Sequence, residues 1–388
     1  MNTRPSDAEI ARRYTLIRER LGEDDAGALV VAGTEYTGFE GAIRWVSGFR
    51  MVHRYAYAVI PRDGDPFMVF PTEARWVGAH GESWITDQRF AEVPGAEISA
   101  IASDRGWDRL AVYGANFIMP GRDVRVLDDS DAQILDWDLT FDLLRAVKSD
   151  EELSLVRHSF ELNERGFWAV LDAYQPGKTE AGIMAPAEEL FVASGTQRTT
   201  MNMVLSGPHG EAGPEFRHPD HQRPVAPSDL LLYSIEIAGP TGYWAEFARP
   251  IVRDGLSPRT AEIMAAYQEA FEAARRGLRA GNTAHDVHRA VFGCFDGLSV
   301  KAGHVTGHSI DMIMVAHPRI GEGVETVLEE NMIISIHPHV VTADDTACLY
   351  MQETFRVTPE GGEQLSSVPI TAFGGDERRE DVVEEARP

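Results

Sequence analysis

Apolar and polar residues follow two periods along the first 145 residues. Over residues 8–21 the apolar side chains recur at the spacing of a helix that faces a core. Short apolar runs bounded by turn-forming residues predict strands at 27–33, 55–60, 67–70 and 109–114. Turn residues separate the second run from the third, which indicates a hairpin. Strands interleaved with helices are typical of an α/β domain.

The pattern changes after residue 145, where a long amphipathic helix is predicted. Ser149 and Glu152 have the S-x-x-E spacing of a helix-capping box. Residues 175–180, QPGKTE, contain Gly-Lys-Thr without the upstream glycine and strand of a phosphate loop, so we interpret them as a turn. We therefore expect two domains and a charged, frayed tail, at 1–145, 146–375 and 376–388.

The stretch SIEIAGPTGYWAEFAR, residues 234–249, predicts a β-hairpin with two opposed carboxylates. Gly239 and Gly242 supply the turn, and a turn centred near Thr241 places Glu236 directly opposite Glu246. Like charges in that position repel each other. Arg249 lies an odd number of residues from Glu246, so we expect it on the other face of the strand. The neutralising partner of the two glutamates is therefore the first question that the sequence raises.

Composition and charge narrow the classes of partner. The 388 residues include 36 basic and 61 acidic side chains, a formal net charge of −25, which argues against nucleic acid or an anionic membrane as a partner. The first residues lack the apolar core of a signal peptide, and no run is apolar enough to span a membrane. The two cysteines exclude a disulfide framework and a cysteine-based zinc site. We expect a cytoplasmic protein.

Residues that can ligate a metal or transfer a proton gather in the second half of the chain. Imidazole and carboxylate groups bind zinc, manganese and iron. A single histidine beside glycine is more often a hydrogen-bonded loop residue, but a carboxylate in an apolar strand is costly unless it is paired. The set is therefore more informative than its members, which are His218, Glu236, Glu246, His304, His308, His337, His339 and Glu353.

The order of these motifs resembles the pita-bread family, which includes methionine aminopeptidase, Xaa-Pro dipeptidase, creatinase, ectoine hydrolase and dimethylsulfoniopropionate lyase. The resemblance rests on the linker LLRAVKSDEELSLVR, the hairpin, and the stretches IRWVSGFR, GHSIDMIMVAHPRI and LEENMIISIHP. It implies an α/β N-terminal creatinase-type domain followed by an α+β pita-bread C-terminal catalytic domain. The similarity in GPTGYWAE is greatest to the small-molecule branches: creatinase, ectoine hydrolase and the lyase.

The resemblance also implies a role for each motif residue. The metal ligands of the family correspond to Glu236, Glu246, His308, His337 and Glu353, with glutamate in place of two aspartates and His337 in place of a glutamate. Ser234 stands where some branches have a further aspartate, and Val315 where the peptidases have a second active-site histidine. His218 matches the loop histidine that transfers protons, with His221 and His209 as the fallback candidates. Glu353 is expected to be catalytic as well as a ligand.

Two interpretations of this variant site remain open. The first is one divalent transition metal, Mn, Fe or Zn, because ligand atoms persist at five positions and imidazole disfavours magnesium. Such a cation would stabilise the opposed glutamates and lower the pKa of bound water. The second is a metal-free site with Glu246 and Glu353 around a protonated histidine, as in creatinase-like members.

The predicted function is hydrolysis of a C–N bond in a small amino-acid-like metabolite or a dipeptide. The alternatives are a lyase that eliminates across a C–S or C–N bond, a metal-independent creatinase-like amidinohydrolase, and a non-catalytic binding protein. By analogy with the small-molecule branches we expect a homodimer in which the N-terminal domain of a partner closes the pocket. The predicted substrate-binding residues are Trp45, Arg50, His53 and His304.

Overall fold

The computed structural model describes residues 4–35, 38–52, 54–76, 83–196, 200–208, 217–345 and 348–374. The chain divides into two compact units. The first contains the residues up to Arg145 together with Asp311–Val315, and the second contains Ala146–Ile310 and the residues from Ala316 onward. The predicted tail at 376–388 and the two candidates His53 and His209 lie outside the described residues.

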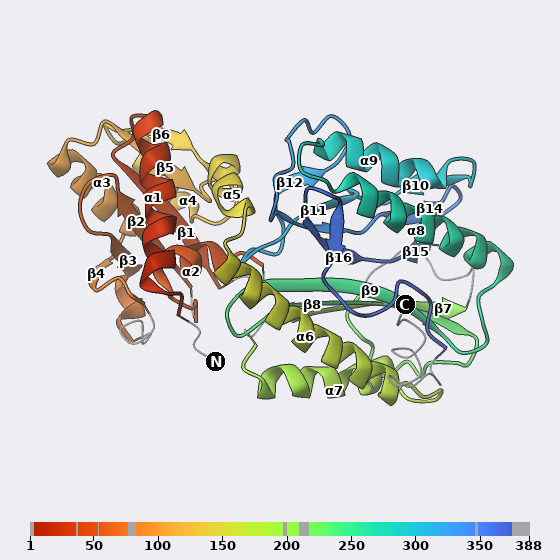
Figure 1. Cartoon of the computed structure of the whole chain (residues 1–388). Helices are drawn as coiled ribbons and strands as arrows, with labels where there is room; N and C mark the ends of the chain where they lie inside the picture. The colour runs from red at the N-terminus through yellow and green to blue at the C-terminus, as the bar shows by residue number, and fades with distance from the viewer. Residues whose placement is uncertain are drawn as a thin grey trace. The chain divides into compact units, whose positions relative to one another are not determined.

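The first unit is built on a six-stranded mixed sheet with the order β4-β3-β2-β1-β5-β6 (Figure 1). The β1–β2 and β2–β3 pairs are antiparallel, and the other three pairs are parallel. The predicted α/β alternation, the first helix and the 55–70 hairpin are confirmed. The strands are Ala28–Thr34 (β1), Tyr55–Pro61 (β2), Phe67–Pro71 (β3), Asp87–Ala91 (β4), Arg109–Tyr113 (β5) and Gln133–Asp136 (β6). The helices are Asp7–Glu23 (α1), Gly41–Ser47 (α2), Pro94–Arg105 (α3), Gly121–Asp128 (α4) and Asp138–Ala146 (α5), with a 3₁₀ turn at Thr72–Trp76 (η1).

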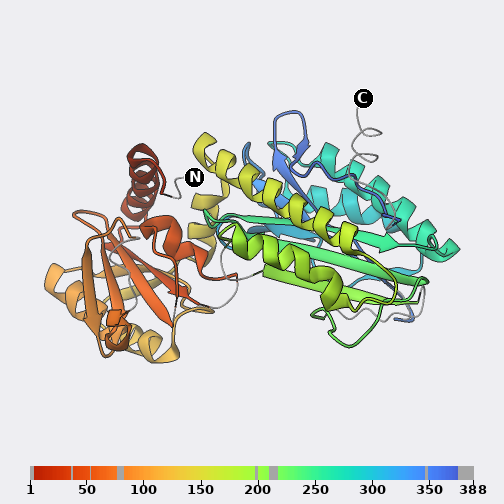
Figure 2. The same ribbon diagram turned by 90° about the horizontal axis from the view of Figure 1, so that it is seen from below.

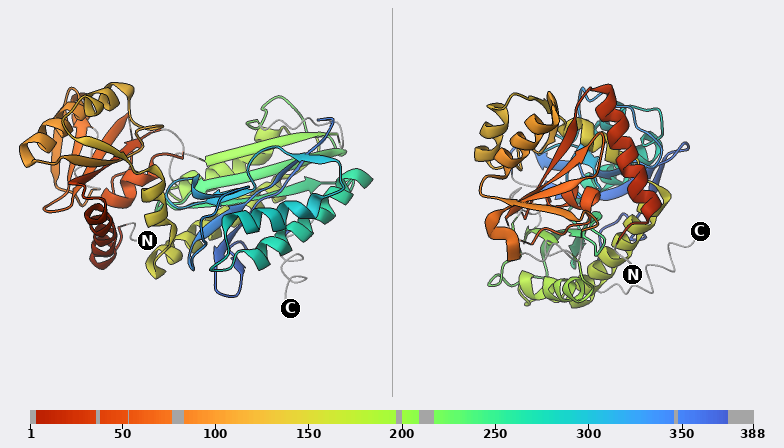
Figure 3. Two further views of the ribbon diagram at one scale, coloured as in Figure 1. Left: turned by 90° about the horizontal axis from the view of Figure 1, so that it is seen from above. Right: turned by 90° about the vertical axis from the view of Figure 1, so that its left-hand side faces the viewer.

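The second unit places helices on both sides of long central strands. Figure 1 shows α6 and α7 on one side of β8 and β9, with α8 and α9 on the other. Figure 2, seen from below, has α6 and α7 in front of the strands, and Figure 3 (left), seen from above, has α8 and α9 in front. The helices are Asp150–Ala173 (α6), Glu180–Ala193 (α7), Pro258–Gly277 (α8) and Ala284–Phe292 (α9), with a 3₁₀ turn at Gly293–Phe295 (η3).

Three sheets form the β-structure of the second unit. Their strand orders are β7-β8-β9, β12-β11-β13-β16-β17 and β10-β14-β15. Tyr267 of α8 and Leu232 of β8 belong to the same apolar core as Ile336 of β13. The strands are Thr200–Pro208 (β7), Asp229–Ala238 (β8), Trp244–Val252 (β9), Val300–Ala302 (β10), Gly307–Ser309 (β11), Ala316–Ile320 (β12), Ile333–Ile336 (β13), His339–Thr342 (β14), Cys348–Tyr350 (β15), Glu353–Val357 (β16) and Gly362–Gln364 (β17).

Helix α6 begins at the predicted capping box. The Ser149 hydroxyl accepts from the Glu152 backbone N–H, and the Glu152 carboxylate accepts from the Ser149 backbone N–H. These two bonds satisfy donors that a helix start leaves unpaired. The 175–180 stretch forms the predicted turn before α7, whose first residue is Glu180. None of the described helices is long and apolar enough to cross a membrane.

The β8–β9 hairpin is held against α6 by polar contacts beside the turn. The Asn163 side-chain amide donates to the Ile235 carbonyl and to the Ala245 carbonyl, each at 3.0 Å. Each of these carbonyls precedes one of the two opposed glutamates in sequence, so Asn163 fixes both strands at that level. A Cβ atom added to Gly239 would lie 2.2 Å from the Ser159 hydroxyl, so only glycine allows this close approach.

Candidate functional site

Glu236 and Glu246 lie directly opposite each other on β8 and β9, as the hairpin pattern predicts. We call these two residues the glutamate pair. The pair is enclosed by protein, with Glu236 5% exposed and Glu246 0% exposed. Arg249 is paired with Tyr233, three positions along β9 from Glu246, so it lies on the other face of the strand as expected. Arg249 therefore does not neutralise the glutamate pair, which must be stabilised by other groups.

A network of neutral polar groups contacts the glutamate pair. The Ser234 hydroxyl lies 3.1 Å from Glu236 Oε1 and 3.1 Å from Gln352 Oε1. The Gln352 side-chain amide donates to Glu246 Oε2 at 2.9 Å and to the Ser335 hydroxyl at 3.0 Å. Glu246 Oε1 has no hydrogen-bond partner although it is buried. One acceptor of the pair is thus left open inside the protein.

Burial changes the protonation of the glutamate pair. It raises the pKa of Glu236 to about 7, with hydrogen bonds from Ser234 and Gln352 opposing the shift. The pKa of Glu246 is raised well above its ordinary value, by burial first and then by the charge of Glu236. Both shifts favour the protonated form, so the pair tends to retain a proton near neutral pH. This proton is one answer to the repulsion that the sequence predicts.

Glu353, a predicted ligand and catalytic residue, instead forms a buried ion pair. Arg249 Nη2 donates to Glu353 Oε2, and both side chains are 0% exposed. Ser366 and Gln364 donate to the same oxygen at 2.7 and 3.1 Å, and the Thr354 N–H donates to Oε1 at 2.9 Å. Three donors thus converge on Oε2, whereas Oε1 accepts one hydrogen bond. In this arrangement Glu353 acts as the partner of an arginine.

Four histidines and a tyrosine form a second group, which we call the histidine cluster: His304, His308, His337, His339 and Tyr350. The ring centroids of His308 and His337 are 4.7 Å apart, and His304 lies 5.0 Å from His337 and 5.2 Å from His339. The His337 and Tyr350 ring centroids are 6.2 Å apart. Neither ring nitrogen of the buried His337 has a hydrogen-bond partner. The cluster thus presents an unsatisfied imidazole.

The imidazoles of the histidine cluster are held in the neutral form. Burial lowers the pKa of His308 to about 4 and that of His339 to about 4. The pKa of His337 is lowered well below its ordinary value, by burial first and then by His308 and His304. A neutral imidazole offers one N–H donor and one lone pair. These histidines can therefore bind polar groups of a substrate near neutral pH.

The five predicted metal ligands do not form a metal site in this arrangement. Over the described residues, which include all five, no group of three or more His, Cys, Asp or Glu side chains is placed to hold a metal ion. Protein ligands of catalytic zinc usually number three. The members of the expected set, Glu236, Glu246, His308, His337 and Glu353, lie in the glutamate pair, the histidine cluster and the Arg249 ion pair, and their role as ligands of one cation stays a prediction.

The predicted proton-transfer histidine, His218, is exposed, and so is His221. Neither joins the ring contacts of the histidine cluster. His218 follows Arg217, whose guanidinium donates to the buried Glu180 carboxylate at 2.8 Å. Glu180 also accepts from the Asp220 N–H at 2.9 Å, so the two ends of the short segment around His218 are anchored to α7. The segment is fixed, while its histidine remains accessible.

The predicted substrate-binding residues differ in how far they are exposed to solvent. Trp45 is 1% exposed in the first unit, where its ring packs beneath the Arg13 guanidinium and against Phe141. In this conformation the side chain is part of the core and does not face a ligand. Arg50 is partly buried. His304 belongs to the histidine cluster and is exposed there.

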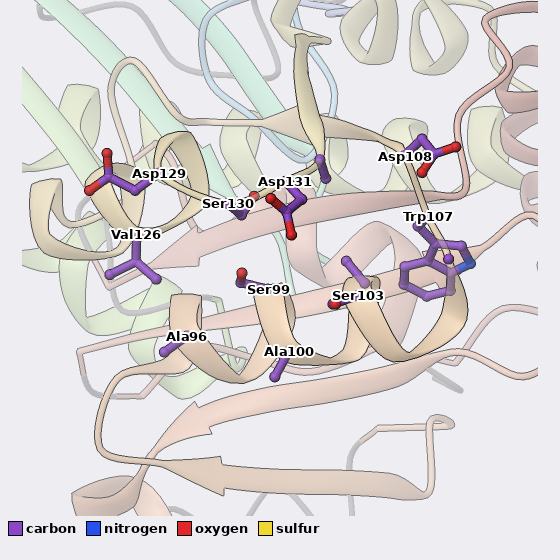
Figure 4. A pocket seen from close by; sticks show the side chains of 13 residues that line it. Ala96, Ser99, Ala100, Ser103, Trp107, Asp108, Val126, Asp129, Ser130 and Asp131 are labelled. Carbon is purple, nitrogen blue, oxygen red and sulfur yellow. The ribbon is translucent and has the colours of Figure 1, made fainter.

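The first unit also contains a pocket of about 530 Å³, at α3 and the C-terminal end of α4 (Figure 4). Asp108, Asp129 and Asp131 contribute carboxylates, and Trp107 lies at one end. None of the predicted site residues lines it. An acidic surface of this kind is commonly solvated, and we assign no function to it.

Three comparisons with known proteins agree with this architecture. The family model of metallopeptidase family M24 matches residues 154–359. The probable dipeptidase PepE of Mycobacterium bovis is 28% identical over 228 residues, which are 58% of this chain and 60% of that protein. The Xaa-Pro dipeptidase of Pyrococcus furiosus is 24% identical over 227 residues, 58% of this chain and 64% of that protein. The matches to these curated relatives thus span less than two thirds of their length.

Solved structures show the same fold over nearly the whole chain. The dipeptidase PepE from Mycobacterium ulcerans superposes with a TM-score of 0.81 at 24% identity, over 95% of this chain and 99% of that one. The prolidase from Pyrococcus horikoshii OT3 gives a TM-score of 0.75 at 19% identity, over 95% and 99%. The predicted combination of a creatinase-type N-terminal domain and a pita-bread catalytic domain is confirmed.

Proposed function

Because the chain belongs to metallopeptidase family M24, we propose that it hydrolyses a C–N bond in a dipeptide or a small amino-acid-like metabolite. The relatives named above as dipeptidases support the peptide form of this proposal. The observation that carries it is the buried glutamate pair, in which Glu246 Oε1 has no hydrogen-bond partner, in the same unit as the unsatisfied imidazole of His337. Open acceptors of this kind suit a substrate that brings N–H donors.

The glutamate pair is our candidate for the general base. Its ionised carboxylate can accept a proton from a water molecule that attacks the carbonyl carbon, while Gln352 donates to Glu246 Oε2. The C–N bond then breaks, and the departing nitrogen takes a proton to leave as an amine. His218, on its anchored and exposed segment, is our candidate for that proton donor. His308 and His337 would hold the substrate carbonyl or amide by hydrogen bonds.

The relatives belong to a metallopeptidase family, but a single Mn, Fe or Zn ion at the five predicted ligands is not the arrangement that the described residues present. The steps above are therefore assigned to side chains alone. We further propose that the enzyme acts as a homodimer. Arg50 and His53 remain our candidates for residues that a partner subunit would contribute.

Turnover by purified protein tests the proposal. A panel of Xaa-Pro dipeptides, other dipeptides and small amides is incubated in H₂¹⁸O, and products are identified by mass spectrometry. We expect release of an amine together with an acid that carries ¹⁸O. A product with a new double bond and no ¹⁸O would establish elimination, and absence of any product across the panel would refute the proposal.

Two variants localise the chemistry. Glu246→Gln keeps the shape of the side chain but removes one of the two carboxyl groups that share the base function, so kcat should fall by about 100-fold or more. Glu325→Gln removes an exposed carboxylate from a loop of the same unit and serves as the matched control, with turnover unchanged.

A further inference from the structure

Glu353 and Glu246 each have one carboxylate oxygen, Oε2, that accepts hydrogen bonds from protein side chains. Glu353 Oε2 already accepts from Arg249, Ser366 and Gln364. A carboxylate oxygen has only two in-plane lone pairs, so a cation at this atom would have to displace a guanidinium. Arginine remains charged at every pH at which the protein is folded, so this displacement is unfavourable.

Arg249 is itself fixed by its surroundings. Its Nε donates to the Pro369 carbonyl at 2.7 Å, and its Nη1 donates to the Gln352 carbonyl at 2.6 Å and the Ala248 carbonyl at 3.0 Å. Its Nη2 donates to the Val368 carbonyl at 2.8 Å as well as to Glu353. A fully buried guanidinium that uses its N–H groups in this way cannot rotate away without leaving those N–H groups unpaired. The positive charge beside Glu353 is a permanent part of the fold.

Gln352 is the side chain that donates hydrogen bonds at the glutamate pair, as Arg249 does at Glu353. Both hydrogens of its amide nitrogen are used, one on Glu246 Oε2 and one on Ser335, and its oxygen lies within reach of the Ser234 hydroxyl. This pattern defines the orientation of the amide, because the flipped group would point its oxygen at a carboxylate. The positive end of an N–H dipole aimed at Glu246 Oε2 disfavours a cation at that oxygen.

We infer that Arg249 and Gln352 take the place of a metal ion at this site, so the catalytic unit binds no divalent cation between its glutamates and histidines. The absence of a suitably placed group of three ligand side chains among the described residues agrees with this inference. Neutral donors and one arginine balance the carboxylates instead. The inference concerns cation binding, and it holds or fails independently of the reaction proposed above.

Calorimetric titration tests the inference on the full chain without substrate. Protein dialysed against a chelator and then against chelator-free buffer is titrated separately with Mn²⁺, Zn²⁺ and Co²⁺, and Co²⁺ binding is also followed by its visible absorption. The net charge of −25 will attract cations weakly to the surface, so each titration is repeated with Glu246→Gln and with the exposed control Glu325→Gln. We expect the three proteins to give the same weak isotherms.

A stoichiometric site that Glu246→Gln weakens by about tenfold or more, and that Glu325→Gln leaves intact, would overturn the inference. Binding that all three proteins share lies elsewhere on the chain and supports it. If Glu246→Gln does not fold, as judged by circular dichroism, His337→Gln replaces it in the same comparison. Failure of the proposed hydrolysis would leave these isotherms unchanged, so the two outcomes can be told apart.

Discussion

Removal of the Arg249 guanidinium should unfold the catalytic unit at much lower temperature. Arg249→Met keeps the length and apolar stem of the side chain but leaves Glu353 buried without its cation. Breaking a buried ion pair by removing one partner costs about 3–5 kcal/mol. Four backbone carbonyls also lose one donor each, but each keeps a second donor, so the uncompensated carboxylate accounts for most of the expected cost. Protein stabilities are about 5–15 kcal/mol, so this is a large fraction of the total.

Urea unfolding followed by circular dichroism measures the effect, with thermal melting as a second readout. For a domain of this size about 1 kcal/mol corresponds to about 2–4 °C, so Tm should fall by roughly 6–20 °C. Arg157→Met is the control, because Arg157 forms an exposed pair with Glu363, and such pairs contribute about 1 kcal/mol or less.

The double variant Arg249→Met/Glu353→Gln separates charge from packing. It removes the uncompensated carboxylate, so it should recover a substantial part of the loss seen in Arg249→Met alone. The reasoning is refuted if Arg249→Met is no less stable than Arg157→Met, or if the double variant is as unstable as the single one.

Two further predictions concern the supports of the site. Burial alone would raise the pKa of Glu180, but hydrogen bonds from Arg217 and Ser206 outweigh burial, so the pKa in the folded protein lies below the ordinary 4.5. The stabilisation that ionised Glu180 contributes is therefore complete above pH 4.5 and is lost as the pH falls through the folded pKa. Acid-unfolding curves should therefore be shallower below pH 4.5 in Glu180→Gln than in the wild type, and parallel curves would contradict this. Asn163→Ala should lower kcat on an identified substrate more than it changes KM, because it releases both strands beside the glutamate pair; unchanged kcat in a folded variant would show that the hairpin needs no such support.

Local signals in the sequence are sufficient to predict a large part of the fold. The Ser149–Glu152 capping box and the opposed position of Glu236 and Glu246 both depend on residues within about a dozen positions of each other. At that range turn chemistry and strand alternation determine which side chains meet. The family resemblance extends this to the fold of each unit, because the order of the motifs along the chain reflects the topology.

The partners of the site residues cannot be predicted from local sequence signals. Arg249 meets Glu353 from 104 positions away, and Gln352 meets Glu246 from 106 positions away. Nothing in the local pattern distinguishes an arginine that supports a hairpin from one that neutralises a distant carboxylate. One signal was present: a glutamine directly before Glu353 has the donors that a buried carboxylate requires.

The histidine cluster illustrates the same limit. His304, His308, His337 and His339 come from separate strands and loops, and burial sets their neutral state. The sequence indicates ligand-type atoms at these positions, but whether they surround a common centre depends on distances set by two separate sheets, one that pairs β11 with β13 and one that contains β14. Assigning five ligands to one ion requires that shared centre, which no local pattern in the sequence establishes.

The metal content of the purified full chain tests the central claim most directly. The protein is produced in medium supplemented with Mn, Fe and Zn, and elemental mass spectrometry measures the ratio of each metal to protein beside a Glu246→Gln sample. The account predicts a ratio far below one ion per chain, equal in the two samples. One ion per chain in the wild type that is missing from Glu246→Gln would contradict it.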